Sequence, residues 1–223
     1  MGNPSNEHRP TPREREIVES MAGLGIPQED IALILGIAPK TLRTKYRDQL
    51  DKGMIKATFA YDVAPHTIES FIALANEQYY DGTVFHRIIK GFMIQGGDSL
   101  GSTTDRAGSG GPGFGVVQEF SRKPHLRGVL SMARQGGEYR DPTRVDSAGG
   151  QFFIMHADQK ALNSHYTAFG QVIDGMDVVD KIAETPTHPD AGGQNNGSTD
   201  PKDRPVIKAI RILPATAEMY GIK

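Results

Sequence analysis

The densest set of residues able to do chemistry lies between Phe85 and Asp98, where an arginine stands among apolar residues and glycines. The segment reads Phe-His-Arg-Ile-Ile-Lys-Gly-Phe-Met-Ile-Gln-Gly-Gly-Asp. With the two-residue period of a β-strand, Phe85, Arg87 and Ile89 share one face, so a permanent cation occupies a position that a barrel would fill with an apolar side chain. Its guanidinium donates hydrogen bonds and does not titrate away. The alternative interpretation is a surface arginine on an edge strand.

Composition excludes several other kinds of site. The chain has no cysteine, so disulfides, thiolate catalysis and cysteine-ligated zinc are excluded. A net charge of -2 provides no overall field toward nucleic acid or anionic membranes. The glycine-rich run at residues 108–113 lacks the Lys-Ser/Thr ending of a phosphate-binding loop. Four histidines without metal-type spacing are predicted to lie on the surface or at a groove rim, namely His125, His156, His165 and His188.

No cofactor is therefore expected. The first thirty residues contain no apolar signal-peptide core, and no later stretch approaches eighteen apolar residues in a row. These features predict a soluble, cytoplasmic protein.

The residue pattern changes near Gly53 from a helical type to a β type, and the elements that must position the arginine lie after this point. Before it, proline starts and glycine stops predict three short helices, beginning at Pro12 with Thr11 as the cap, at Pro27 and at Pro39. After it, short β-type runs between glycines predict a sheet or barrel. The predicted strands are Ile55–Ala60, Val84–Ile88, Phe92–Gln95, Gly128–Met132, Phe152–Met155, Ala168–Val172 and Val206–Leu213, with helices at Pro65–Asn76 and Met176–Ala183.

The segment from Phe85 to Asp98 closely resembles the signature segment of the cyclophilins, a family of peptidyl-prolyl cis-trans isomerases. The similarity extends in order to Gly128–Ala133, Ser147–Ile154 and Thr167–Val172. The resemblance implies a mainly β fold, a closed eight-stranded antiparallel β-barrel capped by two helices. It also implies the family activity, rotation about X-Pro bonds in proline-containing peptides and unfolded proteins, which assists folding.

The resemblance also implies a role for each matching position. Arg87 would be the catalytic residue, and Gln95 would help to hold the substrate backbone. The substrate groove would comprise Phe92, Met93, Ala133, Gln151, Phe153, Leu162 and Tyr166. His86 would have a supporting role. For Phe92, Met93 and Phe153, ordinary core packing is the alternative to a proline pocket.

The physics of the reaction agrees with these roles. Amide resonance sets a rotation barrier of roughly 18 to 20 kcal/mol, whereas the cis and trans X-Pro states differ by only about 0.5 to 1 kcal/mol. A catalyst therefore has to favour the twisted amide and needs no nucleophile or metal. A guanidinium that donates to the prolyl nitrogen or to the neighbouring carbonyl does so.

The chain departs from the family pattern at two groove positions, Ala161 and Tyr166, in one loop and at its first strand. The loop at residues 134–149 looks longer than in compact members, and its Arg134, Arg140 and Arg144 either favour acidic peptides or are simply solvated. No strand-like run precedes Ile55–Ala60. The barrel therefore either lacks its first strand, or two modules were joined. The predicted organisation is a helical segment at 1–53, the isomerase domain at 54–214 and a tail at 215–223.

The segment Gln28–Tyr46 resembles a helix-turn-helix whose second helix is locally basic. Residues 1–53 contain eight Lys/Arg and eight Asp/Glu, so their net charge is zero. A neutral unit binds DNA weakly unless it is paired. A structural or protein-binding module is therefore favoured over DNA contact through Lys40, Arg43, Lys45 and Arg47. Two further hypotheses for the whole chain are a peptide-binding module without turnover and a DNA-associated regulator.

Weak binding of cyclosporin-like macrocycles is the first testable prediction. Ala161 occupies a position often held by tryptophan, which removes a wall and an indole N–H donor, and Tyr166 stands where histidine is common. Calorimetric titration of the full chain with cyclosporin should show weak binding or none. A tight complex would contradict the prediction.

Overall fold

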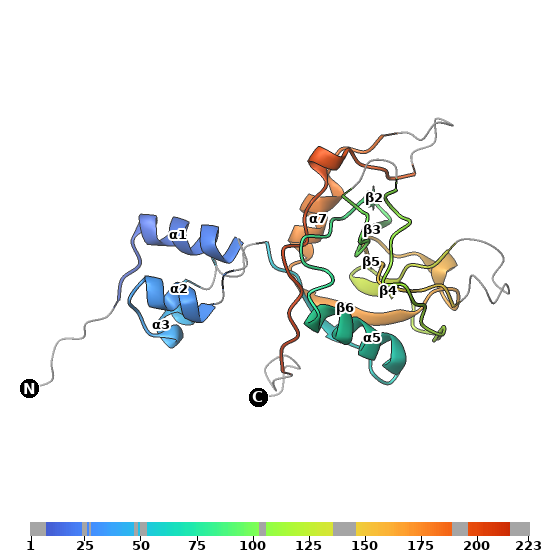
Figure 1. Cartoon of the computed structure of the whole chain (residues 1–223), viewed down its shortest axis with the longest axis horizontal. Helices are drawn as coiled ribbons and strands as arrows, with labels where there is room; N and C mark the ends of the chain where they lie inside the picture. Colours follow the sequence, from blue (N-terminus) through green and yellow to red (C-terminus); the bar gives the residue numbers. More distant parts are fainter. Residues whose placement is uncertain are drawn as a thin grey trace, which may run out of the picture. The chain divides into compact units, whose positions relative to one another are not determined.

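The computed structural model describes residues 8–23, 26, 28–46, 49, 53–102, 106–135, 146–188 and 196–214. The chain divides into two compact units, Met1–Met54 and Ile55–Lys223, which are described separately (Figure 1). The predicted tail at 215–223, together with Arg47, Arg140 and Arg144, lies outside the described residues. Within the described part of the chain, no helix is long and apolar enough to cross a membrane.

The first unit contains three helices, α1 (Pro12–Gly23), α2 (Gln28–Ile34) and α3 (Pro39–Lys45). Thr11 caps α1 as predicted, because its Oγ1 accepts from the Glu14 backbone N–H at 3.2 Å while the Glu14 carboxylate accepts from the Thr11 N–H at 2.7 Å. Gly36, with φ +64°, allows the tight turn that follows α2. The small core consists of Val18, Ile31, Ala32, Leu42 and Tyr46.

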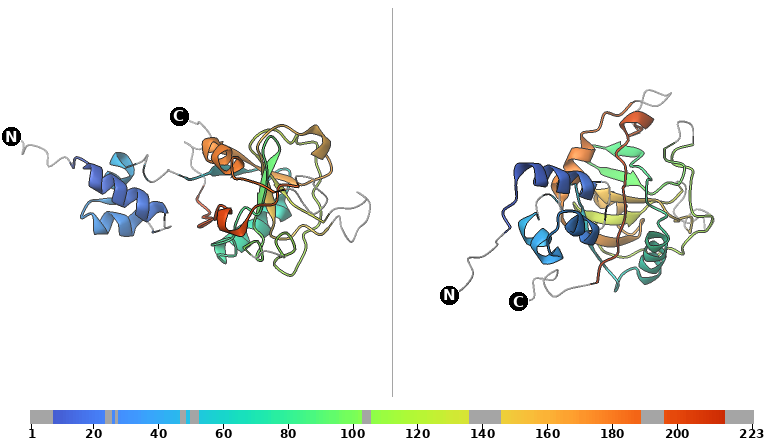
Figure 2. Two further views of the ribbon diagram at one scale, coloured as in Figure 1. Left: turned by 90° about the horizontal axis from the view of Figure 1, so that it is seen from above. Right: turned by 60° about the vertical axis from the view of Figure 1, so that its left-hand side comes forward.

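The second unit is built on one six-stranded antiparallel sheet in the order β1-β6-β4-β5-β3-β2. The right-hand view of Figure 2 follows it from the green strands β2 and β3, through the yellow centre, to the orange β6. The strands are β1 (Lys56–Phe59), β2 (Arg87–Ile89), β3 (Met93–Gly96), β4 (Val129–Met132), β5 (Phe152–Met155) and β6 (Ala168–Asp174). Helix α5 (Pro65–Asn76) contacts β6, α7 (Met176–Ala183) contacts β2 and β3, and the 3-10 turns are η1 (Lys160–Leu162) and η2 (Pro201–Asp203).

Alternation along the central strands sorts their side chains into two apolar clusters. In β5, Phe152 and Ile154 enter the main core, whereas Phe153 belongs to a second, smaller cluster with Met93. Successive strand residues point to opposite faces, so both faces of this sheet are covered by apolar groups. The sheet thus has a core face and a second face on which a groove can form.

The predicted strand Val206–Leu213 is the main difference from the sequence interpretation. Its described residues form one β-bridge, Val84 to Val206, with backbone hydrogen bonds between Ile207 and residues 82 and 83. A strand requires a neighbour along its length, and among the described residues ahead of β1 none forms a strand. The described strands therefore form a six-stranded sheet with edges at β1 and β2, and closure of the barrel stays a prediction.

Phe169 provides a test of the core. Its ring is fully buried and lies 5.1 Å from that of Phe71 and 6.4 Å from that of Phe59. Phe169→Ala should lower the free energy of unfolding by about 3–5 kcal/mol, because it leaves a cavity between these rings. Urea unfolding of the full chain measures this loss.

The matched control for that substitution is Phe114→Ala, at a phenylalanine that is 53% exposed. It should change the free energy of unfolding by less than about 0.5 kcal/mol. Equal effects of the two substitutions would contradict the assignment of Phe169 to the core.

Candidate active site

Arg87 begins β2 and is fixed in place on two sides. In the β2–β3 pair it stands directly opposite Gln95, and its Nη1 donates to Gln95 Oε1 at 3.3 Å. On the other side its Nε donates to the backbone carbonyl of Asn196 at 2.9 Å. Burial lowers the pKa of its guanidinium. These two hydrogen bonds restrain the orientation of the Arg87 guanidinium.

A chain of amide hydrogen bonds extends this support across the sheet. Gln95 Nε2 donates to Gln151 Oε1 at 3.0 Å, and Gln151 Nε2 donates to the carbonyls of Gly108 and Gly110 at 3.1 and 2.8 Å. A Cβ on Gly110 would lie 2.0 Å from Asp98 Oδ1, so only glycine fits there. The glycine-rich run therefore provides the carbonyls that orient Gln151.

The apolar residues of the predicted site gather in the second cluster, next to the arginine. Met93 and Phe153 are buried, and Phe153 stands directly opposite Gln95 in the β3–β5 pair. The cluster also contains Ala133, and the partly buried Phe92, Leu162 and Tyr166 pack against it. Thus the nine predicted site residues lie together, six as an apolar cluster and three as the hydrogen-bonded chain Arg87–Gln95–Gln151.

Tyr166 is held by two aromatic contacts. Its ring meets that of Phe153 edge-on at 5.7 Å, and the Arg134 guanidinium lies 4.8 Å from the Tyr166 centroid. Arg134 Nε also donates to the His165 carbonyl at 3.1 Å. A cation–π contact of this geometry stabilises the tyrosine as a wall of the cluster.

Sequence reasoning missed three groups that support the site. The carbonyls of Asn196, Gly108 and Gly110 are backbone atoms, so no residue type indicates them. His125 was predicted at the surface or rim and is instead 1% exposed, with Nε2 3.0 Å from Ser131 Oγ and its ring stacked 6.2 Å from that of Phe153. This prediction was wrong, because tertiary packing places Asn163 and Ser131 where they satisfy both ring nitrogens.

The buried histidines predict how stability depends on pH. Burial lowers the pKa of both His86 and His125 below the ordinary value of about 6.5. Below that pH the unfolded chain therefore binds protons that the folded chain excludes, and stability falls. The expected slope is at most about 1.4 kcal/mol per pH unit for each histidine. Urea midpoints at pH 7.5, 6.5 and 5.5 measure it.

Two variants isolate that effect. His86→Gln should be less stable at every pH but should show a shallower fall below pH 6.5. His66→Gln, at an exposed histidine, should keep the wild-type slope. A slope in His86→Gln as steep as in wild type would exclude His86 as its source.

The described residues hold no group of three or more histidine, aspartate or glutamate side chains that could bind a metal ion. The site instead combines an oriented guanidinium, amide donors and an apolar wall. Such a set can hold a peptide backbone beside a buried ring and place a fixed positive charge next to it.

Comparison with known proteins identifies the family. Residues 42–215 match the family model "Cyclophilin type peptidyl-prolyl cis-trans isomerase/CLD". The chain is 44% identical over 137 residues to a peptidyl-prolyl cis-trans isomerase of Arabidopsis thaliana, covering 61% of this chain and 81% of the relative. It is 39% identical over 144 residues to peptidyl-prolyl cis-trans isomerase B of Bacillus subtilis, covering 64% and 92%.

Solved structures agree with the sequence relatives. A Cryptosporidium parvum cyclophilin type peptidyl-prolyl cis-trans isomerase, crystallised in the presence of the dipeptide Ala-Pro, has a TM-score of 0.58 at 31% identity. The match covers 72% of this chain and 93% of that one. The chain thus belongs to the cyclophilin family of peptidyl-prolyl cis-trans isomerases, enzymes that rotate the X-Pro peptide bond.

Proposed function

We propose that this isomerase uses Arg87 to stabilise the twisted X-Pro amide, in a groove whose apolar wall holds the proline ring. The observation that carries the proposal is the restraint of one guanidinium by Gln95 and Asn196 beside the cluster of Met93 and Phe153. A charge that is already oriented costs no reorganisation when the amide twists.

The catalytic step requires a difference between two states of the substrate. In the planar amide the nitrogen lone pair is delocalised and accepts poorly. In the twisted amide the nitrogen is pyramidal and accepts a hydrogen bond. Arg87 donates to this nitrogen, or to the neighbouring carbonyl, and so binds the twisted state more tightly than the planar one. No bond to the protein forms or breaks.

The apolar wall has a separate task. Phe92, Met93, Phe153, Leu162 and Tyr166 surround the proline ring and hold it still while the preceding part of the peptide turns. Gln95 and Gln151 hold the substrate backbone, and Ala133 leaves room for it. Fixing one side of the rotating bond reduces the entropy lost in reaching the twisted state. We infer unfolded or flexible chains in the cytoplasm as substrates.

Two alternatives concern the departures from the family pattern. A peptide-binding module without turnover is suggested by Ala161 and by the absence of a strand ahead of β1 in the described residues. The restrained Arg87 favours catalysis instead. For the helical unit we infer a structural or protein-binding role over DNA contact, since Arg43 is engaged by the Glu29 carboxylate at 2.6 Å and by Gln28 at 3.2 Å.

Replacing Arg87 tests the catalytic proposal. In a protease-coupled assay on a proline tetrapeptide, Arg87→Ala should lower kcat/KM about a hundredfold or more, the usual cost of removing a donor to the transition state. Arg87→Lys should recover little activity, because an ammonium group cannot occupy both the Gln95 and the Asn196 contacts.

The matched control is Arg13→Ala, at an exposed arginine of α1. It should leave the rate unchanged. Rates for Arg87→Ala equal to wild type, with folding verified by the same thermal transition, would refute the role of Arg87 and favour another residue as the donor.

A further inference from the structure

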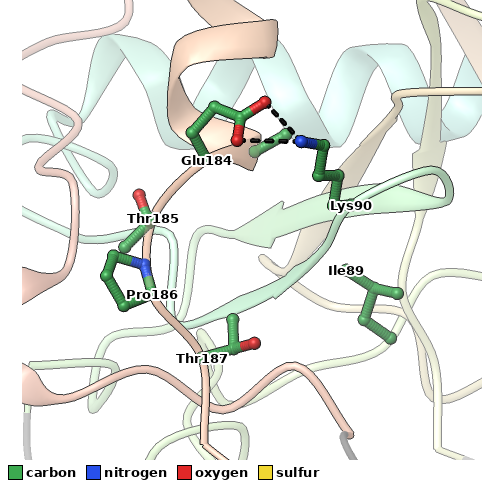
Figure 3. A pocket seen from close by; sticks show the side chains of 7 residues that line it. Ile89, Lys90, Glu184, Thr185, Pro186 and Thr187 are labelled. Atoms are coloured by element: carbon green, nitrogen blue, oxygen red, sulfur yellow. Dashed lines mark hydrogen bonds and ion pairs between the residues drawn. The ribbon is translucent and has the colours of Figure 1, made fainter.

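A cavity lies at the C-terminal end of β2, two residues beyond Arg87. It has a volume of about 390 Å³, within the range of pockets that bind small ligands. Ile89 and Lys90 lie on one side, and Thr185, Pro186 and Thr187 lie on the other (Figure 3). Ala183, at the end of α7, completes the lining.

The cavity has a mixed lining, in which three apolar residues lie beside two threonines and an ion pair. Ile89, Ala183 and Pro186 provide carbon surface, while Lys90 Nζ contacts both Glu184 carboxylate oxygens, at 2.8 and 2.9 Å (Figure 3). The side chains of Lys90 and Glu184 are both exposed to solvent, so this ion pair contributes little stability. An occupant with an apolar side chain and a solvated backbone fits these surroundings better than an ion does.

The cavity adjoins the proposed proline groove at one hairpin, because Ile89 lines the cavity and also packs against the groove cluster. Residues i and i+2 of a strand lie about 7 Å apart on the same face. Ile89, which lines the cavity, is therefore on the same face of β2 as Arg87. Ile89 stands opposite Met93 in the β2–β3 pair and packs against the apolar cluster of the groove. The turn between them closes with the Phe92 N–H donating to the Ile89 carbonyl at 2.9 Å. Ile89 and Lys90 of this hairpin thus line the cavity, while Met93, opposite Ile89, belongs to the groove cluster.

We propose that this cavity is an additional subsite, which binds an apolar side chain of the substrate at a position flanking the proline. The inference rests on the proposed groove, because a peptide held at Arg87 passes Ile89 only if it occupies that groove. Burial of that side chain adds binding energy that a substrate with alanine at the same position does not gain. Substrates with leucine at the right position should therefore be isomerised more efficiently than those with alanine there.

The experiment uses the full chain and a set of ten-residue peptides with one proline. Alanine fills the other positions, and a single leucine is moved from four residues before the proline to four residues after it. Cis/trans exchange is measured by NMR exchange spectroscopy. At one or two positions leucine should raise kcat/KM about five- to tenfold over alanine, as expected for partial burial of its side chain.

Filling the cavity should abolish that gain. Thr187→Trp, and separately Thr185→Trp, should reduce the leucine effect to less than twofold and leave turnover of a proline tetrapeptide unchanged. Thr44→Trp, on the exposed surface of α3, should retain the full leucine effect. In wild type, the leucine peptide should also shift the methyl resonance of Ile89 more than the alanine peptide does.

The outcomes separate the two proposals. If the tetrapeptide is isomerised but no leucine position matters, or the gain survives both tryptophan variants, the subsite inference is overturned and the proposed catalysis stands. An Ile89 methyl that responds equally to both peptides would also overturn it, even if a tryptophan variant did not fold. If wild type and Arg87→Ala turn over the tetrapeptide equally, the proposed catalytic role itself fails.

Discussion

The pairing of β3 with β5 is the constraint on which the site depends. It sets Gln95 opposite Phe153, and so joins the hydrogen-bonded chain that holds Arg87 to the apolar cluster beside it. A shift of this register by one residue would send Phe153 into the core and Ile154 into the groove, because strand side chains alternate between faces. The register therefore fixes both the wall and the donor in one step.

The same alternation explains why the sheet can be stable and functional together. Ile94, Phe152 and Ile154 fill the main core, while their strand neighbours Met93 and Phe153 build the second cluster. The core aromatic rings supply the buried area that stabilises the sheet. The groove face can then keep polar groups such as Gln95, whose hydrogen bonds are satisfied by Gln151 and Arg87 rather than by packing.

Support for the groove comes mainly from loops and from backbone atoms. Arg87 is restrained by the carbonyl of Asn196, more than a hundred residues later, and Gln151 by the carbonyls of a glycine run. Carbonyls fixed by their own backbone are rigid acceptors, so they position long side chains at little entropic cost. The hairpin that follows Arg87 connects two features, since Ile89 packs against the apolar cluster of the groove and also lines the neighbouring cavity.

The sequence by itself determined the helices Pro65–Asn76 and Met176–Ala183 and five of the six strands to within about two residues, and its resemblance to a known family indicated the nine candidate site residues that the structure brings together. Local signals suffice for these features, because helical periodicity, strand alternation and a dense motif are written in neighbouring residues. For β2, predicted at Val84–Ile88, the strand begins later, at Arg87, because residues 84 and 85 pair with the distant segment at 205–206.

Only the tertiary structure decided that Val206–Leu213 forms a single β-bridge rather than a strand, that His125 is buried, and which groups Arg87 contacts. A strand forms only where a neighbour supplies hydrogen bonds, and the composition of residues 206–213 does not reveal that β-bridging reaches only Val206. His125 is predicted at the surface from the sequence, but in the fold it is buried because Asn163 and Ser131 form hydrogen bonds with its two ring nitrogens. In each case the deciding partner lies far away in the sequence, so no local pattern could have named it.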